Sequence, residues 1–222
     1  MSEEIKDMWN IKNLLPGDYL KGEDSQLVEE EKKAERVARI SKYKNSGFPE
    51  KFNGVQLDEL NEKQKETANL FLEKTRSGKS SSLWLCGYAG TGKTCLASAI
   101  AKETALDGKN VKYIKSHLLI EKLKKNQIPI DNVLYELKSN SLVVIDEVGR
   151  YPVPEWESYY LFLIMDELYN LGISVIMISN MDKEKLGGLL GNACVDRFRG
   201  LAKSVEFTGK SYRGTDNELY VA

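Results

Sequence analysis

The sequence has few of the residues that form metal sites or disulfide bonds. Its 222 residues include one histidine and three cysteines, and Cys86, Cys95 and Cys194 lie far apart without a C-x-x-C pair. A structural zinc site needs four clustered ligands, and a disulfide framework needs paired cysteines. We therefore expect neither of them, and expect a protein whose thiols stay reduced.

Long apolar runs and a large charge of one sign are also absent. No run approaches the roughly twenty apolar residues that cross a bilayer, and no signal-peptide pattern opens the chain. The 32 basic and 33 acidic side chains give a net charge of −1, so the overall charge indicates no partner. We expect a cytoplasmic protein with no membrane partner.

A glycine-rich loop is the most informative feature that the sequence contains. It has the pattern G-x-x-x-x-G-K-T and consists of Gly87, Tyr88, Ala89, Gly90, Thr91, Gly92, Lys93 and Thr94. Glycines permit turns that direct backbone N–H groups at phosphates, Lys93 supplies positive charge, and the Thr94 hydroxyl can bind Mg²⁺. A strand pattern at 83–86 and a helix pattern at 94–101 flank the loop, as this motif requires. The loop predicts binding of ATP with Mg²⁺, with a chance match as the alternative.

Two acids end the apolar run at 142–147. This pattern is typical of a buried parallel strand that delivers carboxylates to the carboxyl edge of a sheet. Asp146 is expected to bind Mg²⁺, and Glu147 to orient and deprotonate the attacking water. The alternative is that the acids only cap the next turn.

Two polar side chains farther along are candidates for the same site. Asn180 follows the strand pattern at 173–178 and could reach the γ-phosphate or the attacking water, or it could be an ordinary turn residue. The short helical stretch at 191–199 carries Arg197, which could project into the nucleotide of a neighbouring subunit. A plain surface arginine is the alternative.

Alternating patterns predict an α/β fold with a doubly wound parallel sheet. The expected strands lie at 83–86, 111–114, 142–147, 173–178 and 204–207, and the expected helices at 61–74, 94–101, 117–125, 132–138 and 159–171. The last strand should form an edge of the sheet.

Residues 1–45 differ in composition from residues 46–222, so we expect an N-terminal arm followed by one nucleotide-binding domain. The mixed charges at 29–39 are typical of a solvated helix. The alternative is an arm that docks on a partner protein. Its apolar anchors would be Met8, Trp9, Ile11, Leu14 and Leu15.

A local basic segment is the main indication of nucleic-acid binding. Residues 109–125 contain six lysines and one glutamate, for a net charge of +5. The lysines expected to contact single-stranded DNA are Lys112, Lys115, Lys122, Lys124 and Lys125. Such contacts would read no sequence and would weaken as salt rises. A solvated helix is the alternative, and Tyr113 and His117 are possible base-stacking groups.

Several motifs in order resemble one family. The motifs are residues 46–52, 87–94, 144–149, 178–180, 195–197 and 211–213. Together they are similar to those of the AAA+ ATPases of the DnaC, DnaI and IstB group. The resemblance covers about residues 45–213 and implies an AAA+ core that hydrolyses ATP. It also implies Walker A at 87–94, Walker B at Asp146 and Glu147, sensor 1 at Asn180, an arginine finger at Arg197 and a sensor 2-like Arg213.

The resemblance implies a function as well. Loaders of this group place the hexameric replicative helicase on single-stranded DNA, assemble as a spiral, and carry a helical insertion that lines the DNA channel. We expect a helicase loader of a bacterium, or of a phage in its host's cytoplasm, in which ATP binding drives assembly and hydrolysis resets it. The sequence departs from DnaI-type loaders because no cysteine precedes residue 46, and we expect no full C-terminal lid. An IstB-like transposition ATPase and a small-molecule phosphotransferase are the alternatives.

Overall fold

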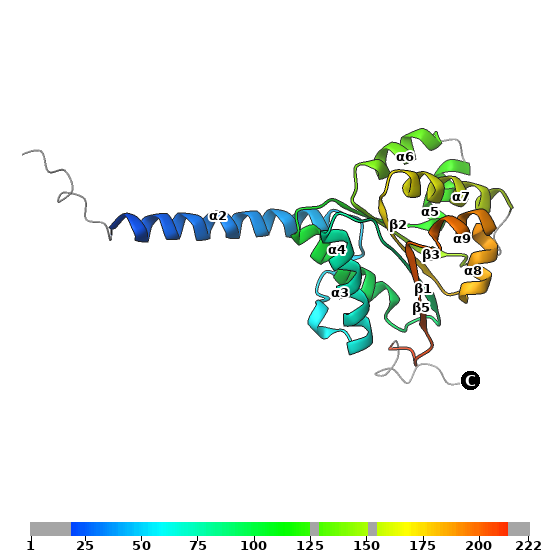
Figure 1. Ribbon diagram of the computed structural model, residues 1–222, viewed down its shortest axis with the longest axis horizontal. Coiled ribbons are helices and arrows are strands. Elements are labelled where there is room, and N and C mark those ends of the chain that lie inside the picture. Colours follow the sequence, from blue (N-terminus) through cyan, green and yellow to red (C-terminus); the bar gives the residue numbers. More distant parts are fainter. Residues whose placement is uncertain (1–18, 125–128, 151–154, 213–222) are drawn as a thin grey trace, which may run out of the picture. The chain divides into compact units, whose positions relative to one another are not determined.

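The computed structural model describes residues 19–124, 129–150 and 155–212 (Figure 1). Its contacts divide the chain into two compact units, residues 1–38 and 39–222. Some of the expected functional positions lie outside the described residues: Met8, Trp9, Ile11, Leu14, Leu15, Lys125 and Arg213. The expectation of no full C-terminal lid also concerns a part of the chain outside them. The assignment of residues 1–45 as an arm and 46–222 as an ATPase domain stays a prediction.

Helix α2 (Tyr19–Lys44) contains residues of both units. In the first unit, the side chains from 28 to 38 are exposed, as expected for a mixed-charge run. In the second unit, Tyr43 is 1% exposed, and its ring centroid lies 5.6 Å from that of Phe48. Its hydroxyl shares a hydrogen bond of 2.7 Å with Oγ of Ser98. The last turns of α2 are therefore part of the globular core.

The doubly wound parallel sheet expected from the sequence is confirmed. Its strands are β1 (Ser82–Gly87), β2 (Val111–Lys115), β3 (Leu142–Val148), β4 (Ser174–Ser179) and β5 (Ala202–Phe207). They pair in parallel in the order β2-β3-β4-β1-β5, so β5 lies at an edge. Because β3, β4 and β1 are neighbours, the residues that follow them meet at one edge of the sheet.

Helices cover both faces of the sheet (Figure 1). On one face, Leu83 and Leu85 of β1 pack in a core with α3 (Glu62–Arg76) and α4 (Lys93–Leu106). On the other face, Trp84 and Cys86 belong to a second core. That core includes side chains of α5 (Ser116–Lys124), α6 (Ile130–Lys138), α7 (Glu155–Asn170), α8 (Lys183–Leu190) and α9 (Asn192–Phe198). None of the helices in the described part of the chain is long and apolar enough to cross a bilayer.

The sequence patterns did not indicate α8 or the two short 3-10 helices, η2 (Glu50–Phe52) and η3 (Leu57–Glu59). Two consecutive glycines, Gly187 and Gly188, lower the intrinsic helix propensity of α8. Its stability comes from tertiary packing, because Leu186 and Leu190 are buried in the second core. The Asp182 side chain also caps the helix by accepting a hydrogen bond of 2.8 Å from the backbone N–H of Lys185.

Truncation of Phe198 should destabilise the fold much more than truncation of an exposed aromatic residue. Phe198 is 1% exposed, and its ring centroid lies 5.6 Å from that of Tyr169 and 6.3 Å from that of Trp84. We expect Phe198→Ala to lower the free energy of unfolding by about 3–5 kcal/mol in urea titrations. Tyr135→Ala is the matched control, since Tyr135 is 81% exposed, and should change it by less than about 0.5 kcal/mol. Equal losses would contradict the described packing.

Candidate functional site

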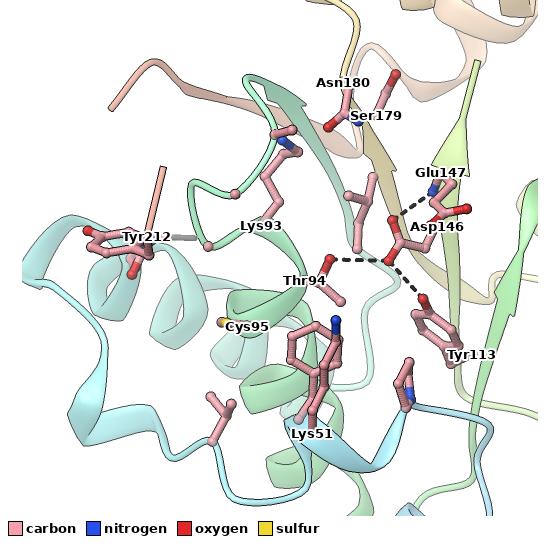
Figure 2. A pocket seen from close by; sticks show the side chains of 18 of the residues that line it. Lys51, Lys93, Thr94, Cys95, Tyr113, Asp146, Glu147, Ser179, Asn180 and Tyr212 are labelled. Carbon is pink, nitrogen blue, oxygen red and sulfur yellow. Dashed lines mark hydrogen bonds between the residues drawn. The ribbon is translucent and has the colours of Figure 1, made fainter. Parts of the chain in front are cut away.

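A cavity of about 820 Å³ lies at the carboxyl edge of the sheet (Figure 2). One wall is the loop between β1 and α4, and a second wall comes from the ends of β3 and β4. The segment from Pro49 to Gln64, which contains η2, η3 and the start of α3, supplies another part of the lining. Most of the expected nucleotide-site residues are therefore brought together around one cavity.

The loop wall has the backbone shape that the motif predicts. Gly87 has a φ of +110°, and a Cβ there would lie 2.3 Å from the carbonyl oxygen of Phe207, so only glycine fits. Gly92 caps the N-terminus of α4, which is the positive end of that helix dipole. Lys93 is buried, and its ammonium group donates hydrogen bonds to the carbonyl oxygens of Gly87 and Tyr88. A bound phosphate would replace these carbonyls as the partner of Lys93.

A bulge in β3 sets the direction of the two carboxylates. Ile145 pairs with Met177 and Val148 with Ser179, so β3 has one extra residue between these pairs. Glu147, within the bulge, has a φ of +59°, and no other described residue except glycine has a positive φ. Such a conformation costs on the order of 1–3 kcal/mol and is found mostly at functional sites. The strand is thus irregular where its acidic side chains reach the cavity.

Asp146 is a buried carboxylate that accepts three hydrogen bonds (Figure 2). Its Oδ2 accepts from the hydroxyls of Thr94, at 3.2 Å, and Tyr113, at 2.8 Å. Its Oδ1 accepts from the backbone N–H of Glu147 at 2.6 Å. Burial raises the pKa of Asp146, and the hydrogen bonds offset part of this rise. Within the described residues, no basic side chain forms an ion pair with this carboxylate.

These features fit a divalent cation. A carboxylate that is 6% exposed and lacks a cationic partner carries a large desolvation cost. Asp146 and Thr94 both line the cavity, and a carboxylate plus a hydroxyl is a ligand set that Mg²⁺ uses beside substrate phosphates. The expected metal-binding pair is therefore chemically consistent with the geometry.

Glu147 is surrounded by basic side chains. Its carboxylate accepts from Lys115 at 3.2 Å and from Arg150 at 2.9 Å, and Nδ1 of His117 lies 3.4 Å away. Partial burial acts to raise the pKa of Glu147, but the hydrogen bonds from Arg150 and Lys115 outweigh it, so the pKa is lowered. A carboxylate with a lowered pKa is a weaker base. Glu147 would have to lose one of these partners to accept a proton from water.

The end of β4 supplies the remaining polar wall. The hydroxyl of Ser179 donates to the carbonyl oxygen of Val148 at 2.7 Å and accepts from the backbone N–H of Met181 at 3.0 Å. These bonds fix the strand end, and the next residue, Asn180, is exposed and lines the cavity (Figure 2). Asn180 is therefore placed where its side chain could reach a bound phosphate or water.

Arg197 is not among the residues that line the cavity of its own chain. It lies on α9, forms an ion pair with Asp166 of α7, and its guanidinium carbon lies 5.7 Å from the ring centroid of Phe162. The side chain is 40% exposed. The structure thus keeps Arg197 at the surface and outside the cavity that Asp146 and Glu147 line.

The candidate DNA-binding lysines do not form one free basic face. Lys115 lines the cavity and bonds to Glu147, while Lys112 forms an ion pair with Glu136. Lys122 and Lys124 fall in α5. Tyr113 is buried, so it cannot stack on a nucleic-acid base in this conformation.

Sequence reasoning missed several residues of the cavity. The sequence indicates Tyr113 only as a possible base-stacking group, whereas its hydroxyl donates to Asp146. The backbone N–H of Tyr212 donates to the carbonyl oxygen of Gly90 at 2.9 Å, and Tyr212 also lines the cavity. The motif at 211–213 pointed to this segment, but no periodicity could have indicated its contact with the loop.

Comparisons with known proteins agree with the fold and with nucleotide binding. The family model described as IstB-like ATP binding protein matches residues 9–219. The replicative helicase loader DnaC of Buchnera aphidicola subsp. Acyrthosiphon pisum is 33% identical over 133 residues, which cover 57% of this chain and 54% of that protein. The insertion sequence IS232 putative ATP-binding protein of Bacillus thuringiensis subsp. berliner is 30% identical over 138 residues, with coverages of 59% and 55%.

The chain thus spans about half the length of these curated relatives. Among solved structures, a crystal structure of the DnaC helicase loader superimposes with a TM-score of 0.64 at 19% identity. The superposition covers 72% of this chain and 100% of that one. At this identity it supports the fold and nothing finer.

Removal of the Lys93 side chain should weaken nucleotide binding. A charge-assisted hydrogen bond to phosphate would be lost, so we expect Lys93→Ala to reduce affinity for a fluorescent ATP analogue at least about tenfold. Lys63→Ala, which removes an exposed lysine of α3, is the control and should bind like the wild type. Unchanged affinity in the Lys93 variant would mean that the phosphates bind elsewhere.

Proposed function

The chain belongs to the IstB-like ATP binding protein family, and on that premise we propose that it is an ATP-dependent loader of a replicative DNA helicase. One observation carries the proposal: the glycine-rich loop, Asp146, Glu147 and Asn180 surround a single cavity. DnaC relatives named as replicative helicase loaders indicate the partner. The protein would act in the cytoplasm of a bacterium, or of the host of a phage, where it would load a hexameric helicase onto single-stranded DNA.

The proposed chemistry is hydrolysis of ATP. The backbone N–H groups of residues 87–94 and the Lys93 ammonium would bind the phosphates. Thr94 and Asp146 would hold Mg²⁺, which when bound neutralises negative charge on the phosphates. Asn180 would contact the γ-phosphate or the attacking water, and Glu147 would orient that water and accept its proton after losing Lys115 or Arg150. We retain Arg213 as a candidate sensor 2-like residue.

Arg197 is proposed to complete the site of a neighbouring subunit. Its exposure and its separation from its own cavity support a role in trans, because an arginine that neutralises transition-state charge must reach the phosphates of some subunit. Asp166 and Phe162 would hold the side chain at the surface until a neighbour docks. ATP binding would then favour a spiral oligomer, and hydrolysis would release it.

Single-stranded DNA is proposed to bind along α5 and its flanks. We retain Lys122 and Lys124, which fall in α5, and Lys125 as candidates for this role. Lys112 and Lys115 would first have to leave Glu136 and Glu147. Exchange of Lys115 from Glu147 to a DNA phosphate would also remove one of the basic partners of the proposed base, so DNA binding and hydrolysis would be coupled.

A transposition ATPase is the second candidate. The family description and the relative from insertion sequence IS232 favour it, because both connect this core with mobile elements. Such a protein would act with a transposase and a target duplex. The two candidates share the ATP site and differ in partner, so only partner binding distinguishes them.

Co-purification with the replicative helicase tests the proposed partner. We expect the full chain to retain the helicase in the presence of ATP, and the double variant Trp9→Ala, Leu14→Ala to lose it, because these apolar side chains are the proposed anchors. Tyr135→Ala, which removes an exposed aromatic residue of the other unit, should retain the helicase. Failure to bind helicase together with stimulation of a transposase would favour the second candidate.

Charge reversal on α5 tests the proposed DNA interaction. Lys122→Glu with Lys124→Glu should lower affinity for single-stranded DNA at least about tenfold and make binding less dependent on salt, because phosphate contacts are lost. Lys183→Glu with Lys185→Glu is the control, since these exposed lysines have the same spacing on α8. Fluorescence anisotropy between about 50 and 200 mM salt measures both. Equal losses in the two double variants would rule out a specific role for α5.

A further inference from the structure

We infer that Tyr113 is a positioning residue for Asp146. It also connects the proposed metal-binding end of the cavity with residues 46–48, which directly precede the cavity-lining segment that begins at Pro49. The inference rests on the proposed function, because it assigns Tyr113 a role in holding a metal-binding carboxylate. Tyr113 is on β2, next to β3, and does not belong to any of the motifs in the sequence.

The hydroxyl of Tyr113 makes a hydrogen bond of ordinary length inside the protein. It donates to Oδ2 of Asp146 at 2.8 Å, and the tyrosine is 6% exposed (Figure 2). The Thr94 hydroxyl also donates to Oδ2, but Thr94 is itself a proposed metal ligand. The backbone N–H of Glu147 binds the other oxygen, Oδ1. Tyr113 is therefore the side-chain donor to Asp146 that does not belong to the proposed ligand pair.

Packing fixes the position of that hydroxyl. The ring centroid of Tyr113 lies 4.4 Å from that of Phe48, and its backbone N–H donates to the carbonyl oxygen of Ser46 at 2.8 Å. Gly47 lies between them with a φ of +101°, and a Cβ there would be 2.7 Å from the carbonyl oxygen of Tyr113. The segment 46–48 is thus held directly against β2. The next residue, Pro49, lines the cavity.

The hydroxyl itself is the informative atom. A phenylalanine would fill nearly the same volume, so packing alone does not require a hydroxyl at this position. A buried hydroxyl is costly unless it is hydrogen-bonded, and here its partner is the proposed metal-binding carboxylate. Rotation of Asp146 about its side-chain bonds would break this bond. Tyr113 therefore keeps Oδ2 directed at the cavity side where Thr94 lies.

The chain provides a close control in Tyr43. This tyrosine is buried in the same core, its ring also lies against Phe48, and its hydroxyl bonds to Oγ of Ser98 instead of a carboxylate. Tyr43→Phe and Tyr113→Phe remove the same atom from the same core. Any general effect of that loss on packing should be similar in the two variants.

The experiment measures the Mg²⁺ dependence of nucleotide binding in the full chain. A fluorescent ATP analogue is titrated with Mg²⁺ in the wild type, Tyr113→Phe and Tyr43→Phe, and its affinity is also measured in EDTA. We expect Tyr113→Phe to raise the half-saturating Mg²⁺ concentration about fivefold or more, with affinity in EDTA within about twofold of wild type. Tyr43→Phe should match the wild type in both measurements. This result supports the inference, because a merely structural residue would not affect the two conditions differently.

Other outcomes overturn the inference in distinguishable ways. Mg²⁺ dependence that is unchanged in Tyr113→Phe, or equally shifted in both variants, overturns it and leaves the proposed ATP site intact. A wild type whose nucleotide binding ignores Mg²⁺ overturns the proposed metal site together with the inference. In an Asp146→Asn background, Tyr113→Phe should cause no further shift, because the two residues act as a pair. An additive shift there would also contradict the proposed role.

Discussion

The buried carboxylate of Asp146 is the group on which the organisation of the cavity depends. A negative charge that is 6% exposed is unfavourable unless donors or a cation surround it. Three donors reach it from three parts of the fold: Thr94 at the start of α4, Tyr113 on β2, and the backbone of Glu147 in the β3 bulge. The carboxylate therefore links the glycine-rich loop to two strands, and a cation between Asp146 and the phosphates would complete its neutralisation.

The backbone beside Asp146 is irregular because two consecutive carboxylates have to reach the cavity. A regular strand would alternate its side chains between the two faces of the sheet, so Asp146 and Glu147 could not both reach the cavity edge. The extra residue in β3 and the positive φ of Glu147 allow both to do so. Glu147 is then held by Lys115 and Arg150. The site thus contains one acid, the proposed metal ligand, that is fixed by neutral donors, and a second acid that is held by the basic side chains of Lys115 and Arg150.

The sequence predicted the parts of this arrangement that follow from local patterns. One local pattern is the glycine-rich loop at 87–94, which needs a strand before it. Another is the apolar run before Asp146, which is itself a strand. The alternation of strands and helices implied the parallel sheet. Contacts between distant residues could not be predicted in this way. Tyr113 occupies a strand position typical of any aromatic residue, and nothing local indicates that its hydroxyl meets Asp146, 33 residues away. Helix α8 was missed for a similar reason. Its two glycines weaken the local helix pattern, and the helix is stabilised by the tertiary packing of Leu186 and Leu190.

The position of Arg197 makes the cavity half of a proposed composite site, in which ATP acts as an assembly signal. The most direct test mixes two variants, Glu147→Gln, which lacks the proposed base, and Arg197→Ala, which lacks the proposed finger. Each should be nearly inactive alone. The mixture should regain ATP turnover, because some interfaces combine the intact Glu147 of one subunit with the intact Arg197 of another. A mixture that forms mixed oligomers, verified by differential tagging, and stays as inactive as its parents would contradict the claim that Arg197 acts across an interface.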